Sequence, residues 1–201
     1  MEAYIPIFTT IESNFEVTLN QAIRKEIMEN ATFGSIEKEE YLLRMGEMPK
    51  YLYFIINGAL RGYSIDYDGN EITSCFIEKG KFCCSFAIME SAASEFLIQA
   101  LDEVKYLRVE LGLVRQLIVK YQEIQNLFNR LSIEGIAYYR NKSKTLMTKS
   151  AAERYQMFNE IYPDLEQRVE QRYIASYLGI TASSFSRLKR KIAKGRKSVD
   201  Y

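Results

Sequence analysis

Histidine is absent from the 201-residue sequence. Without it, neither a Ser–His nor a Cys–His nucleophile pair can form, and zinc or haem sites that rely on imidazole ligands are excluded. Catalysis by carboxylates or lysine stays open, but no motif in the chain supports it. We therefore expect a protein that is not an enzyme.

Cysteines and long apolar runs are also scarce. The chain has only Cys75, Cys83 and Cys84, and an odd count with two adjacent members argues against a disulfide framework. We expect reduced, buried thiols. No stretch approaches the ~20 apolar residues that a membrane-spanning helix needs, and the first residues, MEAYIPIFTTIESNFE, lack the basic start and apolar stretch of a secretory signal. These absences predict a cytoplasmic protein with no membrane partner.

Positive charge is sparse in the first two thirds of the chain and abundant in the last third. Residues 1–139 contain 13 basic and 20 acidic side chains, whereas residues 140–201 contain 14 basic and 6 acidic ones. An acidic body with a basic end is expected when one part of a protein binds a polyanion and the other does not. A basic tail that is merely solvated is the alternative at this point.

The spacing of apolar residues predicts the secondary structure. A helix is expected over 11–28, where an apolar residue recurs every fourth position. From residue 41 to 109, short runs rich in β-branched and aromatic residues alternate with glycine and proline, which predicts a meander of strands. Asp68-Gly69 favours a tight hairpin turn there; the stretch from Asp66 to Glu71 can also be read as a fragment of a calcium loop, but the remaining ligand positions are missing.

The chain after Val109 is expected to be helical. A short helix is predicted over 111–121, a longer one over 122–144, and a third over 151–162 that Ser150 caps and Pro163 ends. The longer helix can lie on the sheet or form an exposed dimer seam, and its length favours the seam. The residues expected in that seam are Ile124, Leu127, Phe128, Leu131 and Tyr138.

The stretch YIASYLGITASSFSRLKRK, residues 173–191, has the pattern of a helix-turn-helix unit. Ala175 is small where two helices cross closely, Gly179 supplies a left-handed backbone for the turn, and Thr181 stands as N-cap of the second helix. The residues that match the pattern are Gln171, Ile174, Ala175, Leu178, Gly179, Ile180, Phe185 and Leu188.

The remaining face of the second helix is polar and basic. In this geometry its N-terminal part enters the major groove, where Arg187 can donate two hydrogen bonds to O6 and N7 of a guanine while lysines contact phosphates. An amphipathic helix pair with a solvated basic tail is the alternative. The predicted DNA-binding residues are Thr181, Ala182, Ser183, Ser186, Arg187, Lys189, Arg190 and Lys191.

These motifs resemble those of the Crp/Fnr-type transcription regulators, typified by the cyclic AMP receptor protein and the fumarate and nitrate reduction regulator. The matching stretches are YLYFIINGALRGY at 51–63, Gly80-Lys81-Phe82 and the helix-turn-helix pattern, with Arg187 at the family's base-reading arginine. The resemblance implies an α+β fold with an N-terminal β-roll, similar to a cyclic nucleotide-binding jelly roll, and flanking helices. A long dimerisation helix and a C-terminal all-α helix-turn-helix domain follow, which gives expected domains of 1–121, 122–146 and 147–201.

The chain departs from the family at the effector site. Members that bind cyclic AMP use a Gly-Glu pair and an Arg-Ser pair, and alignment from Phe82 places Cys84-Ser85 and Glu95-Phe96 there. A carboxylate repels a phosphate, and no arginine lies between Arg61 and Arg108. We expect no cyclic AMP bound in the usual manner, no iron–sulfur cluster, because only three cysteines are present, and no haem. The expected effector pocket consists of Phe82, Cys83, Cys84, Ser85, Glu95 and Phe96.

The sequence therefore predicts a homodimeric, sequence-specific transcription regulator. Its expected partners are double-stranded DNA, a second copy of the chain, an unidentified and less anionic small-molecule effector if one exists, and RNA polymerase. Because Ala182 and Ser183 stand where some relatives carry Arg and Glu, we expect a different half-site from theirs. The alternative is a small-molecule-binding sensor module whose DNA-binding head has degenerated.

Overall fold

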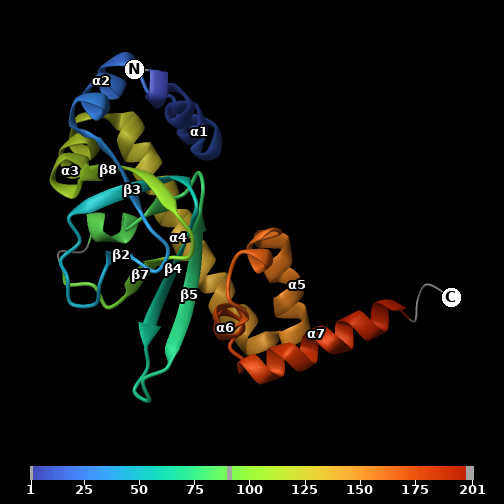
Figure 1. Cartoon of the computed structure of the whole chain (residues 1–201). Coiled ribbons are helices and arrows are strands. Elements are labelled where there is room, and N and C mark those ends of the chain that lie inside the picture. The colour runs from blue at the N-terminus through green and yellow to red at the C-terminus, as the bar shows by residue number, and fades with distance from the viewer. Residues whose placement is uncertain (1, 90–91, 198–201) are drawn as a thin grey trace. The chain divides into compact units, whose positions relative to one another are not determined.

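The computed structural model describes residues 2–89 and 92–197, and for residues 85 and 194–197 it describes only the backbone. The chain divides into two compact units (Figure 1). The first consists of residues 1–62 and 76–138, and the second of residues 63–75 and 139–201. The tip of one β-hairpin therefore groups with the C-terminal helices.

The strands form two four-stranded sheets. One has the order β1-β8-β3-β6, and the other has the order β2-β7-β4-β5. Strands adjacent in sequence are mostly not adjacent in a sheet, since β3 pairs antiparallel with β8 and β6. The predicted meander is wrong in this respect; the order is that of a roll. The strands are β1 (Thr32–Ile36), β2 (Tyr41–Leu43), β3 (Tyr51–Asn57), β4 (Ala59–Ile65), β5 (Glu71–Glu78), β6 (Phe82–Cys83), β7 (Leu97–Ala100) and β8 (Val104–Glu110).

The helical elements precede and follow the strands, so the α+β class is confirmed. Short 3-10 helices accompany them, and α4 is the long helix that the sequence indicates. Among the described residues, no helix combines the length and apolar character needed to cross a membrane. The helical elements are η1 (Glu2–Tyr4), α1 (Ile5–Phe15), α2 (Gln21–Asn30), η2 (Ser85–Ile88), α3 (Leu111–Lys120), α4 (Gln122–Thr148), α5 (Ala151–Ile161), η3 (Leu165–Gln167), α6 (Gln171–Tyr177) and α7 (Ala182–Lys197).

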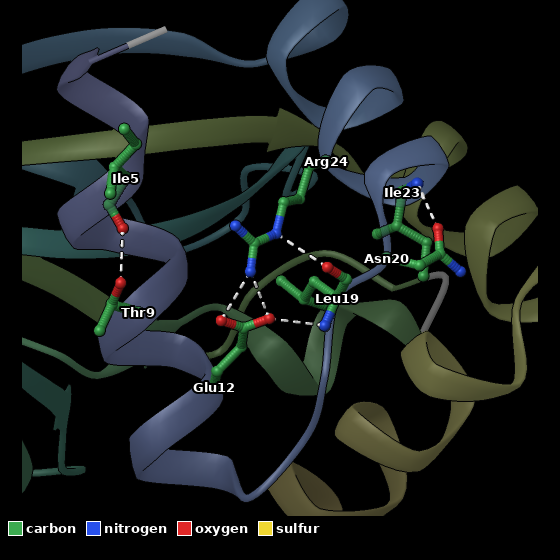
Figure 2. Close-up of polar contacts among 7 residues, drawn as sticks. All are labelled: Ile5, Thr9, Glu12, Leu19, Asn20, Ile23 and Arg24. Atoms are coloured by element: carbon green, nitrogen blue, oxygen red, sulfur yellow. Dashed lines mark hydrogen bonds and ion pairs between the residues drawn. The ribbon is translucent and has the colours of Figure 1, made fainter.

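The single helix expected over 11–28 is in fact two helices. Glu16 has a left-handed backbone with φ 47°, and Asn20 caps α2 by accepting the Ile23 N–H at 3.0 Å. The Glu12 carboxylate accepts the Leu19 N–H at 2.7 Å and the Arg24 guanidinium at 2.7 and 2.8 Å (Figure 2). These bonds satisfy the polar groups that the break exposes.

Two of the apolar clusters in the first unit bear on the predicted elements. One lies between the two sheets and includes Tyr53, Ile55, Leu60 and Val104. The other lies on the opposite face of the β3–β8 pair, where α1, α2, α3 and the start of α4 cover it. Fully burying one large apolar side chain contributes about 1.5–3 kcal/mol, so these helices are held mainly by this face. Four of the five apolar residues that predict the opening helix are buried in the second cluster, namely Ile11, Phe15, Leu19 and Ile23.

The turn between β4 and β5 is a tight hairpin, as predicted. Gly69 has φ 84°, and Oδ1 of Asp66 accepts the backbone N–H groups of Asp68 and Asn70 at 3.0 and 2.8 Å. Hydrogen bonds from the backbone and side chain of Asn70 lower the pKa of Asp66. The carboxylate thus organises its own turn. In the part of the chain that the structure describes, no three acidic or cysteine side chains are grouped to hold a metal ion.

Candidate nucleic-acid interface

A glycine turn joins α6 to α7 in the second unit. Gly179 has φ 66°, and the Ile180 N–H donates to the carbonyl oxygen of Ala175 at 3.0 Å across the turn. A Cβ added at Gly179 would lie 2.9 Å from Cδ2 of Leu146. The left-handed backbone therefore favours glycine here, whereas the exposed Leu146 side chain could shift to admit a Cβ.

The angle between α6 and α7 is filled by buried apolar side chains. Ile174 and Phe185 are fully buried, and Ala175 is nearly so where the two helices cross. The Tyr155 ring of α5 packs edge-on against Phe185, with centroids 5.2 Å apart. Leu165, which precedes α6, is also fully buried. The residues of the pattern thus pack in a small core, to which α5, α6 and α7 contribute; Figure 1 shows these three helices.

Thr181 caps the second helix of the pair. Its Oγ1 accepts the Ser184 N–H at 3.2 Å, which satisfies one of the otherwise unpaired N–H groups at the start of α7. Ala182 and Ser183 are exposed beside it. The first turn of α7 therefore presents small side chains, so that backbone groups and the following residues can approach a ligand closely.

The predicted DNA-binding side chains fall into two groups. Ser186 and Lys189 are partly buried, whereas the other six are exposed along α7. Arg187 donates from Nη2 to Ser184 Oγ at 3.2 Å, a contact one turn back along the helix. The six exposed residues are Thr181, Ala182, Ser183, Arg187, Arg190 and Lys191.

Lys189 points toward its own protein. Its Nζ lies 2.5 Å from Oε1 of Glu166, and only 33% of the side chain is exposed. Oε2 of the same carboxylate accepts the Tyr155 hydroxyl at 2.5 Å. Burial raises the pKa of Glu166, but the hydrogen bonds from Lys189 and Tyr155 outweigh burial and leave the pKa below its usual value. Lys189 thus has an ion-pair partner within its own unit, and its contact with DNA stays a prediction.

The residues predicted for the effector pocket are not all together. Phe82 and Cys83 are consecutive on β6, so their side chains lie on opposite faces of the sheet. Phe82 packs on Phe15 and Phe54 under α1, with centroids 5.4 and 5.1 Å apart, while Cys83 is buried between the sheets. Glu95 is exposed before β7, as is Phe96. The side chain of Ser85 lies outside the described part of the chain.

Cys83 and Cys84 are adjacent in space as well as in sequence. Their Sγ atoms lie 3.7 Å apart, and neither residue forms a disulfide. Cys84 has φ 64°, a left-handed backbone that is uncommon for a residue with a side chain. Burial, followed by the neighbouring Cys84, raises the pKa of Tyr53. These three residues, all of the first unit, form the end of the roll interior near β6.

One charged residue inside the roll was missed. Arg61 of β4 is fully buried, and its Nη2 donates to Oε1 of Gln99 on β7 at 3.2 Å. An ionised group in the interior is costly unless polar groups surround it. Burial does not alternate along this strand, because all five residues from Ala59 to Tyr63 are buried, so no alternation in the sequence singles out Arg61.

The residues expected in the dimer seam of α4 differ in their burial. Ile124 and Leu127 are buried in the core of their own chain, whereas Phe128, Leu131 and Tyr138 are partly buried. The apolar residues most exposed on the middle of α4 are Ile133 at 67% and Ile136 at 61%. They lie three positions apart, on one side of the helix.

Comparisons with known proteins agree with this architecture. Residues 33–121 match the cyclic nucleotide-binding domain family. The structure of FixK2 from Bradyrhizobium japonicum matches with a TM-score of 0.73 and 19% identity, covering 82% of this chain and 85% of that one. A protein from Eubacterium rectale assigned to the Crp/Fnr family matches with a TM-score of 0.73 and 21% identity, covering 88% and 85%. No curated protein matches the chain.

A third similar structure is that of CLP from Xanthomonas campestris, a c-di-GMP responsive global regulator. It matches with a TM-score of 0.69 and 13% identity, covering 88% of this chain and 93% of that one. Identities this low establish the fold alone. Residues 33–121 thus resemble a cyclic nucleotide-binding domain, and the chain has the fold of Crp/Fnr-family regulators over most of its length, as the sequence resemblance implied.

Proposed function

We propose that this chain, with its cyclic nucleotide-binding domain and Crp/Fnr fold, is a sequence-specific DNA-binding transcription regulator. The observation that carries the proposal is the face of α7. It begins with a capped, small-residue turn and continues with exposed Arg187, Arg190 and Lys191. Helices of this kind read base edges with their N-terminal residues and bind phosphates with the basic residues that follow.

A second copy of the chain is the proposed partner along α4. Ile133 and Ile136 are apolar and exposed, and a twofold pairing of α4 would remove both from water. Two copies of α7 would then bind successive major grooves, with half-sites roughly 34 Å apart. A near-palindromic operator follows from that symmetry, and RNA polymerase is a further proposed partner at the promoter.

Control by an effector in the roll is proposed on the basis of the domain family. The residues that would hold a cyclic phosphate in the usual manner are replaced by Cys84-Ser85 and Glu95-Phe96, so the proposed effector differs from cyclic AMP. Glu95 and Phe96 are exposed, which leaves the interior around Tyr53, Cys83 and Cys84 as the proposed location. A signal acts only if it binds one arrangement of the dimer more tightly than another.

A selection from random duplex oligonucleotides tests the proposal. The purified full chain should enrich a near-palindrome, and cell-extract metabolites added to the same assay should change the yield if an effector exists. A chain that retains duplexes without sequence preference would instead be a sensor module with a degenerate DNA-binding head. A chain that retains none would contradict DNA binding altogether.

A further inference from the structure

We infer that Ser176 and Lys142 are positioning residues that fasten the tip of the β4–β5 hairpin to the helix-turn-helix, and that this clasp orients α7 for DNA. The clasp lies entirely within the second unit, which contains residues 63–75 and 139–201. Its effect on DNA rests on the proposed function, whereas the clasp itself does not.

Ser176 of α6 bridges two backbone groups of β5. Its Oγ donates to the Glu71 carbonyl oxygen at 2.7 Å and accepts the Thr73 N–H at 2.9 Å. β5 is the last strand in its sheet, so backbone groups along its outer edge lack a neighbouring strand. The Ser176 hydroxyl therefore forms two hydrogen bonds with backbone groups at this edge and connects the edge to α6.

Lys142 of α4 reaches the same strand from a second helix. Its Nζ donates to the carbonyl oxygens of Thr73 and Ser74 at 2.9 and 2.6 Å. The ammonium also lies 4.0 Å from the ring centroid of Tyr177, the residue after Ser176. A cation over an aromatic face is attracted by the ring, most strongly where water is excluded. Side chains from α4 and α6 thus converge on residues 71–74 of one strand.

The clasp can position α7 because the helix pair is stiff. α6 and α7 share a buried core and the Gly179 turn, so a displacement of Ser176 carries Phe185 and the following turns of α7 with it. β4 and β5 continue from the hairpin tip into the roll, so a change in these strands has a direct path to α6. Packed and hydrogen-bonded contacts can carry coupling of this kind, and residues 71–74 supply such contacts.

The clasp leaves the DNA-facing surface open. Thr181, Ser183 and Arg187 are exposed while Ser176 and Lys142 hold the hairpin, so the hairpin and a duplex do not compete. Holding α7 in one orientation lowers the ordering cost of binding. The clasp therefore favours DNA binding.

The test measures two quantities on full-length Ser176→Ala, after its far-UV spectrum and melting temperature confirm folding. Hydrogen exchange at the Thr73 amide, normally bonded to Ser176 Oγ, should accelerate about fivefold or more, which corresponds to the loss of a hydrogen bond of about 1 kcal/mol. Affinity for the selected duplex should fall about three- to tenfold. Ser176→Thr, which keeps the hydroxyl, should restore both. The matched control is Ser143→Ala, which should change neither, since this serine of α4 is exposed and donates a weak hydrogen bond to Met147 Sδ at 4.0 Å.

Lys142→Met provides the second arm, with exposed Lys144→Met as its control. Lys142→Met should weaken DNA binding about as much as Ser176→Ala does. Lys144→Met should weaken it by no more than the loss of one exposed positive charge would. Unchanged exchange at Thr73 in Ser176→Ala would overturn the clasp. Faster exchange with unchanged or higher DNA affinity would overturn its role in orienting α7. If the wild-type chain binds no duplex, the proposed function fails, and the exchange measurement alone decides whether the clasp exists.

Discussion

Lys189 of α7 and Glu166 of η3 form an ion pair, with Nζ 2.5 Å from Oε1, which ties the second helix of the pair to the segment before the first. The same carboxylate accepts the Tyr155 hydroxyl, so the pair belongs to a network that joins α5, η3 and α7. Lys189 therefore belongs to an internal network of its unit, at a position that the sequence predicts to contact DNA.

The first prediction separates Lys189 from its neighbour Lys191. Lys189→Met should lower the free energy of unfolding by about 1 kcal/mol, a value discounted for partial exposure of the pair. Lys191→Met, at an exposed position, should leave stability within about 0.5 kcal/mol of wild type. Urea unfolding of both variants measures this. Equal stabilities of the two variants would contradict the assignment of Lys189.

Gly179 supports a second prediction. Gly179→Ala forces a side chain onto a backbone with φ 66° and places its Cβ 2.9 Å from Leu146. The free energy of unfolding should fall by about 1–3 kcal/mol from backbone strain, and by a smaller amount from the contact, because the exposed Leu146 side chain can shift. Gly69→Ala is the matched control, because Gly69 has φ 84° and nothing within 4 Å of an added Cβ. A smaller loss at residue 179 than at residue 69 would show that the close approach of Leu146 is unimportant.

The capping box at the start of α5 has a pH dependence with a definite sign. Hydrogen bonds from the Ser150 backbone, from Lys149 and from the Ser150 hydroxyl lower the pKa of Glu153 from 4.5 to about 2. A carboxyl group with a depressed pKa in the folded state contributes stability above pH 4.5 and loses it as the pH falls toward 2. Glu153→Gln should therefore be less stable than wild type at pH 7, and the difference should shrink between pH 4.5 and 2. A constant difference across that range contradicts the role of the charge.

Lys142 has a pH dependence of the same sign in a higher pH range. Burial lowers its pKa from 10.5 to about 8, although the Cys75 thiol of β5 acts in the other direction, and Tyr177 of α6 faces the same ammonium. Between these two pH values the unfolded chain holds a proton that the folded chain has released, so stability rises with pH. Wild type should gain stability relative to Lys142→Met between pH 8 and 10, as measured by urea unfolding. A difference that is flat or falls with pH would show that the ammonium is not buried.

Local features were the part of the fold that could be predicted. The helix-turn-helix follows from residues a few positions apart, since Ile174, Leu178 and Phe185 fall on facing sides of two helices and Gly179 permits the turn. The hairpin at Asp68-Gly69 and the cap at Ser150 are equally local. Each depends on the conformational preference of one or two residues, which the sequence states directly.

Features that depend on distant partners could not be read in the same way. The opening helix breaks between α1 and α2, where Glu12 binds Arg24 and the Leu19 amide. The spacing of apolar residues continues through this break, so it could not reveal it. Lys189 looks like any other basic residue of α7 until Glu166 is placed beside it. Nothing in the sequence near Ser176 indicates a partner for its hydroxyl. Its two hydrogen-bond partners are on β5, more than a hundred positions earlier in the chain.

The central claim is that α7 reads base edges through Arg187, and its most direct test is an affinity measurement on the selected duplex and its single-base variants across a range of salt concentrations. Arg187→Ala should lose about 1–3 kcal/mol of binding free energy and relax the preference at one base pair, while Lys191→Ala weakens all sequences alike and reduces the salt slope by about 1. Losses that are equal and independent of sequence in both variants would contradict the account.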